Sequence, residues 1–560
     1  MCSILILLAL PFSIRSASPP NSSAPIVHVT GGALAGKLQD GISTFEGIPF
    51  AAPPLGNLRW REPQPVASWS GTRDATHFAT PCTQSAIGVD AFLAPLAATY
   101  QTPFVVQPFK SSEDCLYLNV FTPWPPAAKG FPVMVWLHGG SNRAGTGADE
   151  SYNGSSLASH GVLVVTINYR LGVMGFFAHP ELTAESPHHS SGNYGLLDQI
   201  AALQWVQQNI AQFGGDPQNV TLFGESAGSI DATTLMTSPL TKGLFRRVIA
   251  ESGPAFGLAA PLTRAQAEAV GTAVAQTAAG ESTTQARAFA TLRGLPADQV
   301  VDLDRSVLAS RYQNFDPNGS VVDGWLLPMS AGKAFASGKI QKVDLLAGLN
   351  GRELSAFRIG AAAAAKQSTK PPQKTAPTDA VKKLADAAHP LYGGWTDMAV
   401  AVYLAQILMH GDIGVDRASN DILMACPIGA EAALVRSAGA RAFLYRFDRS
   451  VPGKGEPQLG AFHALEIPYV FNTFTDRSWR WLPFTETDRK LSAMIQIYWT
   501  NFAKFGDPNG SGLPAWKPWN NSEEPYLEFS QSGAALPLRN FSPPFCHLSP
   551  HGLQERLAGN

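Results

Sequence analysis

The chain of 560 residues is long enough for several small domains or for one large domain with insertions. Hydrophobic residues make up 45% of it and charged residues 15%, a balance typical of a globular protein with a large core. The net charge is −2, and no basic run is interleaved with aromatic residues, which argues against a nucleic-acid partner or an anionic membrane surface.

Residues 1–18 are predicted to be a signal peptide. The apolar run from Ser3 to Ile14 is followed by Arg15 and by small residues up to Ser18. This run is too short to span a bilayer comfortably. The alternatives to a signal peptide are an N-terminal anchor or a wrongly assigned start codon. We therefore expect a secreted or periplasmic protein whose mature chain has no membrane span.

Short strands and turns are expected over residues 26–50, and longer strands follow. Residues 133–140, 161–170 and 220–223 form unbroken apolar runs rich in β-branched residues. Such runs are typical of strands that are buried on both faces, as in a parallel sheet.

A helix is predicted between the second and third of these strands, over residues 198–214. Asp198 is the expected N-cap, the apolar residues recur at helical spacing, and Gly214 ends the helix. Strands that alternate with helices indicate an α/β fold with a large, mostly parallel central sheet flanked by helices.

The middle of the chain contains one low-complexity stretch, residues 360–377. Its alanine run and its Lys/Pro/Gln/Thr composition predict a mobile surface insertion. No other segment looks like a domain boundary. Residues 19–560 are therefore predicted to form one domain.

The pattern Gly224-Glu225-Ser226-Ala227-Gly228 lies between the strand at 220–223 and a predicted helix over 227–236. A strand, Gly-x-Ser-x-Gly and a helix in this order form the nucleophile elbow, in which the serine lies on a sharp turn at the end of a strand. A serine in an ordinary turn is the alternative. The setting favours Ser226 as a nucleophile.

Several motifs resemble the type-B carboxylesterase and cholinesterase family of α/β-hydrolases. They are FEGIPFAAPPLGNLRWREPQP (45–65), SEDCLYLNVFTP (112–123), NYGLLDQIAALQWVQQNIAQFGGDPQNVTLFGESAGS (193–229) and GAFHALEIPYVF (460–471). The resemblance covers nearly the whole mature chain. It implies an α/β-hydrolase fold with helical insertions over the active site, and hydrolysis of carboxylic esters by a serine.

A serine needs a base, and in this fold the chain order is serine, acid, histidine. His463 matches the family's base motif, and the resemblance implies Glu353 in GLNGRELSAF as the acid. Arg352 and Leu354 depart from the family pattern there, where an acidic residue and a glycine are common. A structural histidine and a surface glutamate are the alternatives.

The tetrahedral intermediate of ester hydrolysis needs an oxyanion hole. The resemblance assigns the donors to the backbone N–H groups of Gly140, Ser141 and Ala227. Ser141 stands where the family usually has a third glycine, so the loop must accept a side chain at that position. The family also places Glu225 and Ser252 near the active-site hydrogen-bond network, and Glu466 is expected to support the same region; a cap or solvent role for Glu225 and Ser252 is the alternative.

Five cysteines are present, and Cys2 belongs to the predicted signal peptide. The remaining four, in an exported chain, suggest two disulfides with three possible pairings, whereas a cytosolic chain would keep free thiols. The family resemblance implies the pairs Cys82–Cys115 and Cys426–Cys546.

The resemblance implies that a choline-binding member would stack the cation on a tryptophan in the first disulfide loop, but residues 83–114 contain none. They do contain Phe92, Tyr100, Phe104 and Phe109, which favours an apolar or aromatic ester. These aromatic residues could instead only pack the loop. The sequence thus predicts a serine carboxylesterase that needs only an ester substrate and water, with no cofactor and no metal, since His188 and His189 form an isolated pair. A lipase for long acyl chains and a non-catalytic adhesion or binding protein are the two rival functions. The oligomeric state cannot be read from the sequence.

Overall fold

A computed structural model describes residues 24–127, 129–257, 261–280, 282–311, 319–367 and 377–548. Residues 1–18, predicted to be a signal peptide, lie outside the described residues. The strands are β1 (Ile26–Val29), β2 (Gly32–Ala35), β3 (Lys37–Gln39), β4 (Ile42–Pro49), β5 (Thr72–Asp74), β6 (Tyr117–Pro123), β7 (Phe131–Leu137), β8 (Leu163–Ile167), β9 (Gly215–Glu225), β10 (Arg247–Glu251), β11 (Leu262–Thr263), β12 (Val321–Val322), β13 (Asp344–Asn350), β14 (Ala442–Phe447), β15 (Tyr526–Phe529) and β16 (Ala535–Leu538).

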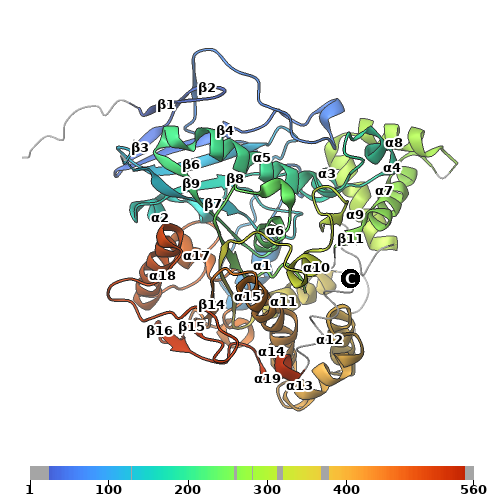
Figure 1. The fold of residues 1–560 in the computed structure, drawn as a ribbon. Helices are drawn as coiled ribbons and strands as arrows, with labels where there is room; N and C mark the ends of the chain where they lie inside the picture. The colour runs from blue at the N-terminus through green and yellow to red at the C-terminus, as the bar shows by residue number, and fades with distance from the viewer. Residues whose placement is uncertain are drawn as a thin grey trace, which may run out of the picture.

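The helices lie mainly between and after these strands (Figure 1). They are α1 (Asp90–Tyr100), α2 (Ser155–Ser159), α3 (Gly172–Phe176), α4 (Pro180–Glu185), α5 (Tyr194–Asn209), α6 (Ala227–Leu235), α7 (Arg264–Ala279), α8 (Gln285–Gly294), α9 (Ala297–Arg311), α10 (Ala331–Ala336), α11 (Glu353–Gln367), α12 (Pro377–Tyr392), α13 (Thr396–His410), α14 (Asp412–Asn420), α15 (Cys426–Ser437), α16 (Glu456–Leu459), α17 (Ile467–Phe471), α18 (Glu486–Phe505) and α19 (Pro544–Leu548).

Among the described residues, the central sheet has 11 strands in the order β16-β15-β14-β13-β10-β9-β7-β8-β6-β4-β3. Pairing is parallel from β8 across to β15 and antiparallel at both edges. This is the α/β-hydrolase arrangement, and it confirms the predicted fold class.

Alternate residues of β7 serve two cores, one on each face of the sheet. Val133 and Val135 belong to the core that includes Leu203 of α5, whereas Met134 and Trp136 belong to the core that includes Leu491 of α18. Because both faces are covered, the strand reads as a continuous apolar run.

The start of the helix before β9 corrects a prediction. Asp198 is not an N-cap: α5 begins at Tyr194, and the fully buried Asp198 carboxylate accepts hydrogen bonds from Nε and Nη2 of Arg170, both at 2.7 Å. Asp198 therefore lies within the helix rather than at its start, and its buried carboxylate is paired with Arg170. Gly214, at φ 82°, ends the short 3₁₀ segment that follows α5, as the sequence suggested.

The low-complexity stretch is helical in its first part. Its first part, residues 360–367, continues helix α11, because alanine has the highest helix propensity. Residues 368–376 lie outside the described residues, and Pro377 begins α12.

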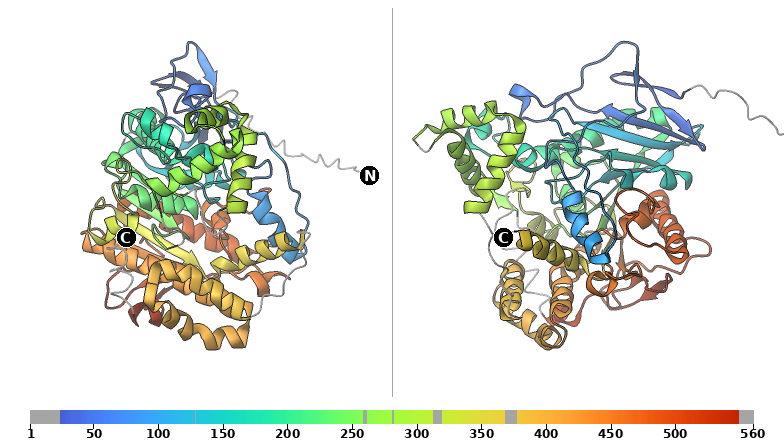
Figure 2. Two further views of the ribbon diagram at one scale, coloured as in Figure 1. Left: turned by 90° about the vertical axis from the view of Figure 1, so that its right-hand side faces the viewer. Right: turned by 180° about the vertical axis from the view of Figure 1, so that it is seen from behind.

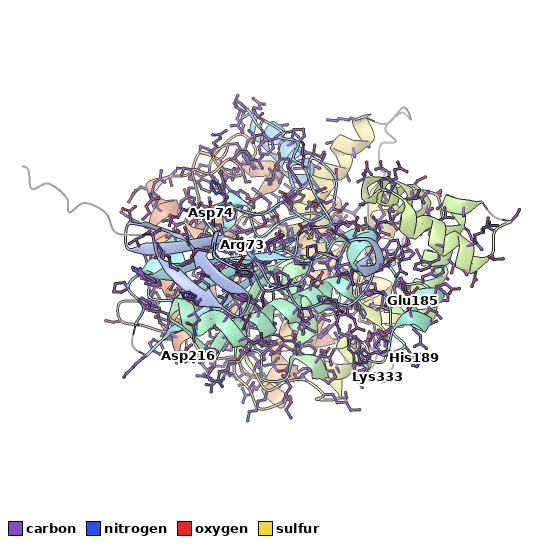
Figure 3. All side chains as sticks on the ribbon, turned by 90° about the horizontal axis from the view of Figure 1, so that it is seen from above. Arg73, Asp74, Glu185, His189, Asp216 and Lys333 are labelled. Carbon is purple, nitrogen blue, oxygen red and sulfur yellow. A yellow bond between two sulfur atoms is a disulfide. The ribbon has the colours of Figure 1, made fainter. Side chains whose placement is uncertain are left out.

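The helical insertions gather at two places. Helices α7 to α9 form one group at the side of the molecule, and α12 to α14 lie at the end opposite β1 and β2 (Figures 1 and 2). Glu185, labelled in Figure 3 on the side of the first group, pairs with Arg293 of α8 at 2.9 Å and with Arg61 at 3.0 Å. These ion pairs link the first group to the body that carries the sheet.

Candidate active site

Ser226 lies on a strained turn between β9 and α6. Its backbone has φ 55° and ψ −121°, a conformation that L residues rarely adopt. A Cβ atom at Gly228 would lie 2.0 Å from the carbonyl oxygen of Leu137, and one at Gly224 would lie 2.6 Å from the carbonyl carbon of Gly228. Packing around the turn therefore requires both glycines and holds Ser226 at the carboxyl end of the sheet.

His463 and Glu353 meet at the same end of the sheet. Oε2 of Glu353 lies 2.6 Å from Nδ1 of His463, and Oε1 accepts a hydrogen bond from the Asn350 N–H at 2.6 Å. Glu353 is fully buried, and His463 is 6% exposed. Since one carboxylate oxygen is held by the end of β13, the other is fixed against the imidazole. Ser226, Glu353 and His463 all line one cavity.

Arg352, one of the departures from the family pattern, connects the two loops that carry this pair. Its N–H donates to the carbonyl oxygen of Ala461 at 2.9 Å, and its guanidinium donates to the carbonyl oxygens of Pro457 at 3.0 Å and Gln458 at 2.8 Å. The unusual arginine thus ties the Glu353 loop to the loop that leads to His463.

The loop after β7 passes beside the nucleophile. Gly140, Ser141 and Asn142 all have positive φ, at 105°, 57° and 54°. A Cβ atom at Gly140 would lie 2.1 Å from the Ala144 carbonyl oxygen, whereas Ser141 has an exposed side chain that lines the cavity. Within the described part of the chain, the N–H groups of Gly140, Ser141 and Ala227 donate no hydrogen bond.

Two adjoining cavities open on Ser226, of about 280 Å³ and about 200 Å³. They share Ser141, Ser226, Phe357 and His463. The first is also lined by Ile230, Thr234, Ala255, Leu354 and Met424, and the second by Val89, Phe92, Leu93, Tyr152 and Trp479. We call them the first arm and the aromatic arm.

Sequence analysis singled out Phe92 but missed Phe357 and Trp479. The ring of Phe92 lies 6.3 Å from that of His463, and the ring of Phe357 lies 4.9 Å from it. Both rings pack beside the imidazole. Trp479 lies outside every motif quoted above, so no local pattern predicted that it would line the site.

Three of the predicted supporting residues form a buried network behind the catalytic candidates. Ser252 Oγ donates to Glu466 Oε1 at 3.0 Å, and Asn350 Nδ2 donates to Glu466 Oε2. Glu225 lies nearer the imidazole, with its Oε1 3.1 Å from Nε2 of His463. Asn350, which the sequence did not single out, connects this network to Glu353.

These carboxyl groups are electrostatically coupled to the imidazole. Burial lowers the pKa of His463, but the Glu225 and Glu353 carboxylates outweigh it and raise that pKa to about 9. Burial also raises the pKa of Glu225 to about 8. The two groups therefore titrate as a coupled pair, and His463 can act as a base only in its neutral form.

Glu225→Gln is expected to shift the acidic limb of the kcat/KM profile to lower pH by about one unit, because an anion beside the imidazole is lost. His463 must be neutral to accept a proton, so lowering its pKa lets activity appear at lower pH. The measurement is initial rate against pH for an ester whose own pKa values lie outside the range. A limb that stays in place or moves upward would show that Glu225 does not raise the pKa of His463.

Both predicted disulfides are present. Cys82 pairs with Cys115, and Cys426 pairs with Cys546. The first closes a loop that contains α1, whose Phe92 and Leu93 line the aromatic arm. An ion pair of 2.7 Å between Arg477 and Asp90 holds the start of α1 as well.

Replacing Cys82 and Cys115 by serine is expected to lower the free energy of unfolding by about 3–4 kcal/mol, the loop-closure entropy for a separation of 33 residues. Urea unfolding followed by tryptophan fluorescence measures the change. The control is the wild-type protein under the same non-reducing conditions. An unchanged midpoint would mean that the α1 loop is held by its packing and its ion pair alone.

Within the described residues, no group of three or more His, Cys, Asp or Glu side chains could hold a metal ion. His188 stacks on Trp325 with ring centroids 3.8 Å apart. Across the same part of the chain, no helix is both long and apolar enough to cross a membrane.

The sheet and the strand–turn–helix at Ser226 define an α/β-hydrolase. The model of the carboxylesterase family matches residues 23–541, and the chain belongs to this family. It is 35% identical to human cocaine esterase, over 94% of this chain and 91% of that protein. It is 36% identical to fumonisin B1 esterase of Sphingopyxis macrogoltabida, over 90% of this chain and 87% of that protein.

Solved structures agree with this assignment. A PNB esterase superposes with a TM-score of 0.76 at 29% identity, over 96% of this chain and 99% of that one. A carboxylesterase of Geobacillus stearothermophilus superposes with a TM-score of 0.74 at 29% identity, over 95% of this chain and 99% of that one. The protein is a carboxylic ester hydrolase, as the sequence predicted.

Proposed function

We propose that Ser226 attacks the ester carbonyl while His463 takes its proton and returns it to the leaving alcohol. Glu353 accepts the Nδ1–H of neutral His463, which leaves Nε2 unprotonated so that it can take that proton, and it stabilises the imidazolium that forms. Water, deprotonated by His463, then attacks the acyl carbonyl; the bond to Ser226 Oγ breaks, the carboxylic acid leaves, and His463 returns the proton to Oγ. The observation that carries the proposal is the 2.6 Å contact between Glu353 and His463 beside a serine on a strained elbow.

The oxyanion is proposed to accept hydrogen bonds from the N–H groups of Gly140, Ser141 and Ala227. Support comes from the positive φ of Gly140 and Ser141 and from the lack of other acceptors for these donors in the described chain. Ala227 is the first residue of α6, where the helix dipole also favours negative charge.

The substrate is proposed to be a small, uncharged ester with an apolar or aromatic group. Phe92, Tyr152, Trp479 and Phe357 line the aromatic arm, and each arm lies below the 300–1,000 Å³ range of drug-sized sites. Export from the cytosol is also proposed, because two disulfides persist only in an oxidising compartment.

Hydrolysis of p-nitrophenyl esters from acetyl to palmitoyl tests this function. We expect kcat/KM to peak at short acyl chains because the two arms are small. A peak at the longest chains would instead indicate a lipase. No turnover of any ester by folded protein would favour a binding protein.

A further inference from the structure

The oxyanion loop turns through two consecutive left-handed residues, Ser141 and Asn142. The left-handed conformation is sterically unfavourable for serine, whereas asparagine tolerates it better. The loop therefore needs an attachment close to Ser141 that holds the backbone in a conformation serine does not prefer.

Asn142, which like Asp231 is part of the wall of the first arm, provides that attachment. Its side chain is 6% exposed, and its Nδ2 donates to Oδ1 of Asp231 at 3.2 Å. The carbonyl oxygen of Asn142 accepts a hydrogen bond from the N–H of Gly172. The residue next to Ser141 is thus held at its side chain and at its backbone.

Asp231 is itself held rigidly. It lies on α6, five residues after Ser226, and is 2% exposed. Its Oδ2 accepts a hydrogen bond from Gln199 Nε2 of α5 at 2.6 Å. Helix α6 also carries the Ala227 N–H. The Asn142–Asp231 bond therefore fixes the position of the Ser141 N–H relative to the helix that carries the Ala227 N–H.

The two ends of the loop are held by other contacts. The carbonyl oxygen of His138 accepts a hydrogen bond from the Tyr169 hydroxyl at 2.6 Å. The N–H of Gly145 donates to Gln84 Oε1 at 2.8 Å, and the carbonyl oxygen of Gly145 accepts from Gln84 Nε2 at 2.7 Å. Loss of the Asp231 contact would therefore leave the Asn142 side chain unheld, with its backbone bond to Gly172 remaining, while both ends of the loop stay in place.

We propose that Asp231 is a positioning residue which, through Asn142, holds Ser141 in its left-handed conformation and keeps the Ser141 N–H aimed at the oxyanion. The proposal rests on the oxyanion hole of the proposed function. It explains how this chain uses a serine at a position where a glycine would adopt the same backbone without strain.

The test is a set of variants assayed with a short p-nitrophenyl ester and with an aryl trifluoromethyl ketone, which forms an oxyanion when a serine adds to it. Asp231→Ala is expected to lower kcat by about 10-fold or more with KM nearly unchanged, a part of the 10²–10³-fold loss known for removal of a donor. Affinity for the ketone should fall by a similar factor. Asn142→Ala removes the same bond from the other side and should match it.

Two rescues separate positioning from a purely structural role. In Asp231→Asn, the new amide oxygen can still accept from Asn142, and Gln199 can present its Oε1, which has no partner in the described chain, to the new NH₂ group. This variant should stay within about threefold of wild type, because the bond to Asn142 is kept. Adding Ser141→Gly to Asp231→Ala should recover at least about threefold in kcat, because glycine adopts positive φ freely.

Thermal unfolding accompanies each assay, and Asn142→Ala takes the place of Asp231→Ala if the latter fails to fold. Unchanged kcat and ketone affinity in both alanine variants would overturn the proposal. Equal losses in Asp231→Asn and no recovery with Ser141→Gly would overturn it too, since they would indicate only general destabilisation. Failure of the proposed function looks different: Ser226→Ala would then keep its activity.

Discussion

Ser226→Ala is expected to lower kcat by about 10⁶-fold, the loss seen when the nucleophile of a serine triad is removed. Without Oγ no acyl-enzyme can form, and only ground-state binding and the oxyanion donors remain. The assay is turnover of the best short-chain p-nitrophenyl ester, together with mass spectrometry for an acyl adduct on Ser226.

Ser229→Ala is the matched control for this change. Ser229 lies on the same helix, is buried, and donates to the Gly253 carbonyl oxygen at 2.6 Å, but it does not line either arm. It should keep most of the activity. Comparable activity of Ser226→Ala and wild type would mean that ester hydrolysis occurs elsewhere on the molecule.

Glu353→Gln has the second largest expected effect, about 10⁴-fold in kcat. The amide can donate to Nδ1 of His463, which stabilises the tautomer that carries its proton on Nε2 and cannot accept one from Ser226. The imidazolium would also lose its counter-charge. Steady-state kinetics near neutral pH measure the loss, and circular dichroism checks the fold.

Glu466→Gln is the control for a buried carboxylate of the same network. Glu466 accepts from Ser252 and Asn350 rather than contacting the imidazole at hydrogen-bond distance. Glu466→Gln should therefore lower kcat far less than Glu353→Gln does. Equal losses in the two variants would show that neither carboxylate has a privileged role.

The sequence predicted the central strands and the mostly parallel sheet correctly, because burial on both faces leaves continuous apolar runs. It was wrong where a contact distant in sequence decides the local structure. Asp198 looks like an N-cap until Arg170 is brought beside it. Residues 360–367, predicted to be a mobile surface insertion, extend the helix that begins at Glu353, because alanine favours a helix locally; residues 361–366 are mostly exposed, and their mobility stays a prediction.

The sequence by itself determined the family, the α/β class and the candidate trio Ser226, Glu353 and His463, because motifs and strand runs are local patterns. Only the tertiary structure decided what surrounds them. It placed Glu225 against His463, Trp479 in the aromatic arm and Asp231 beneath Asn142. Distances, burial and coupled protonation depend on residues far apart in the chain, and no local pattern contains that information.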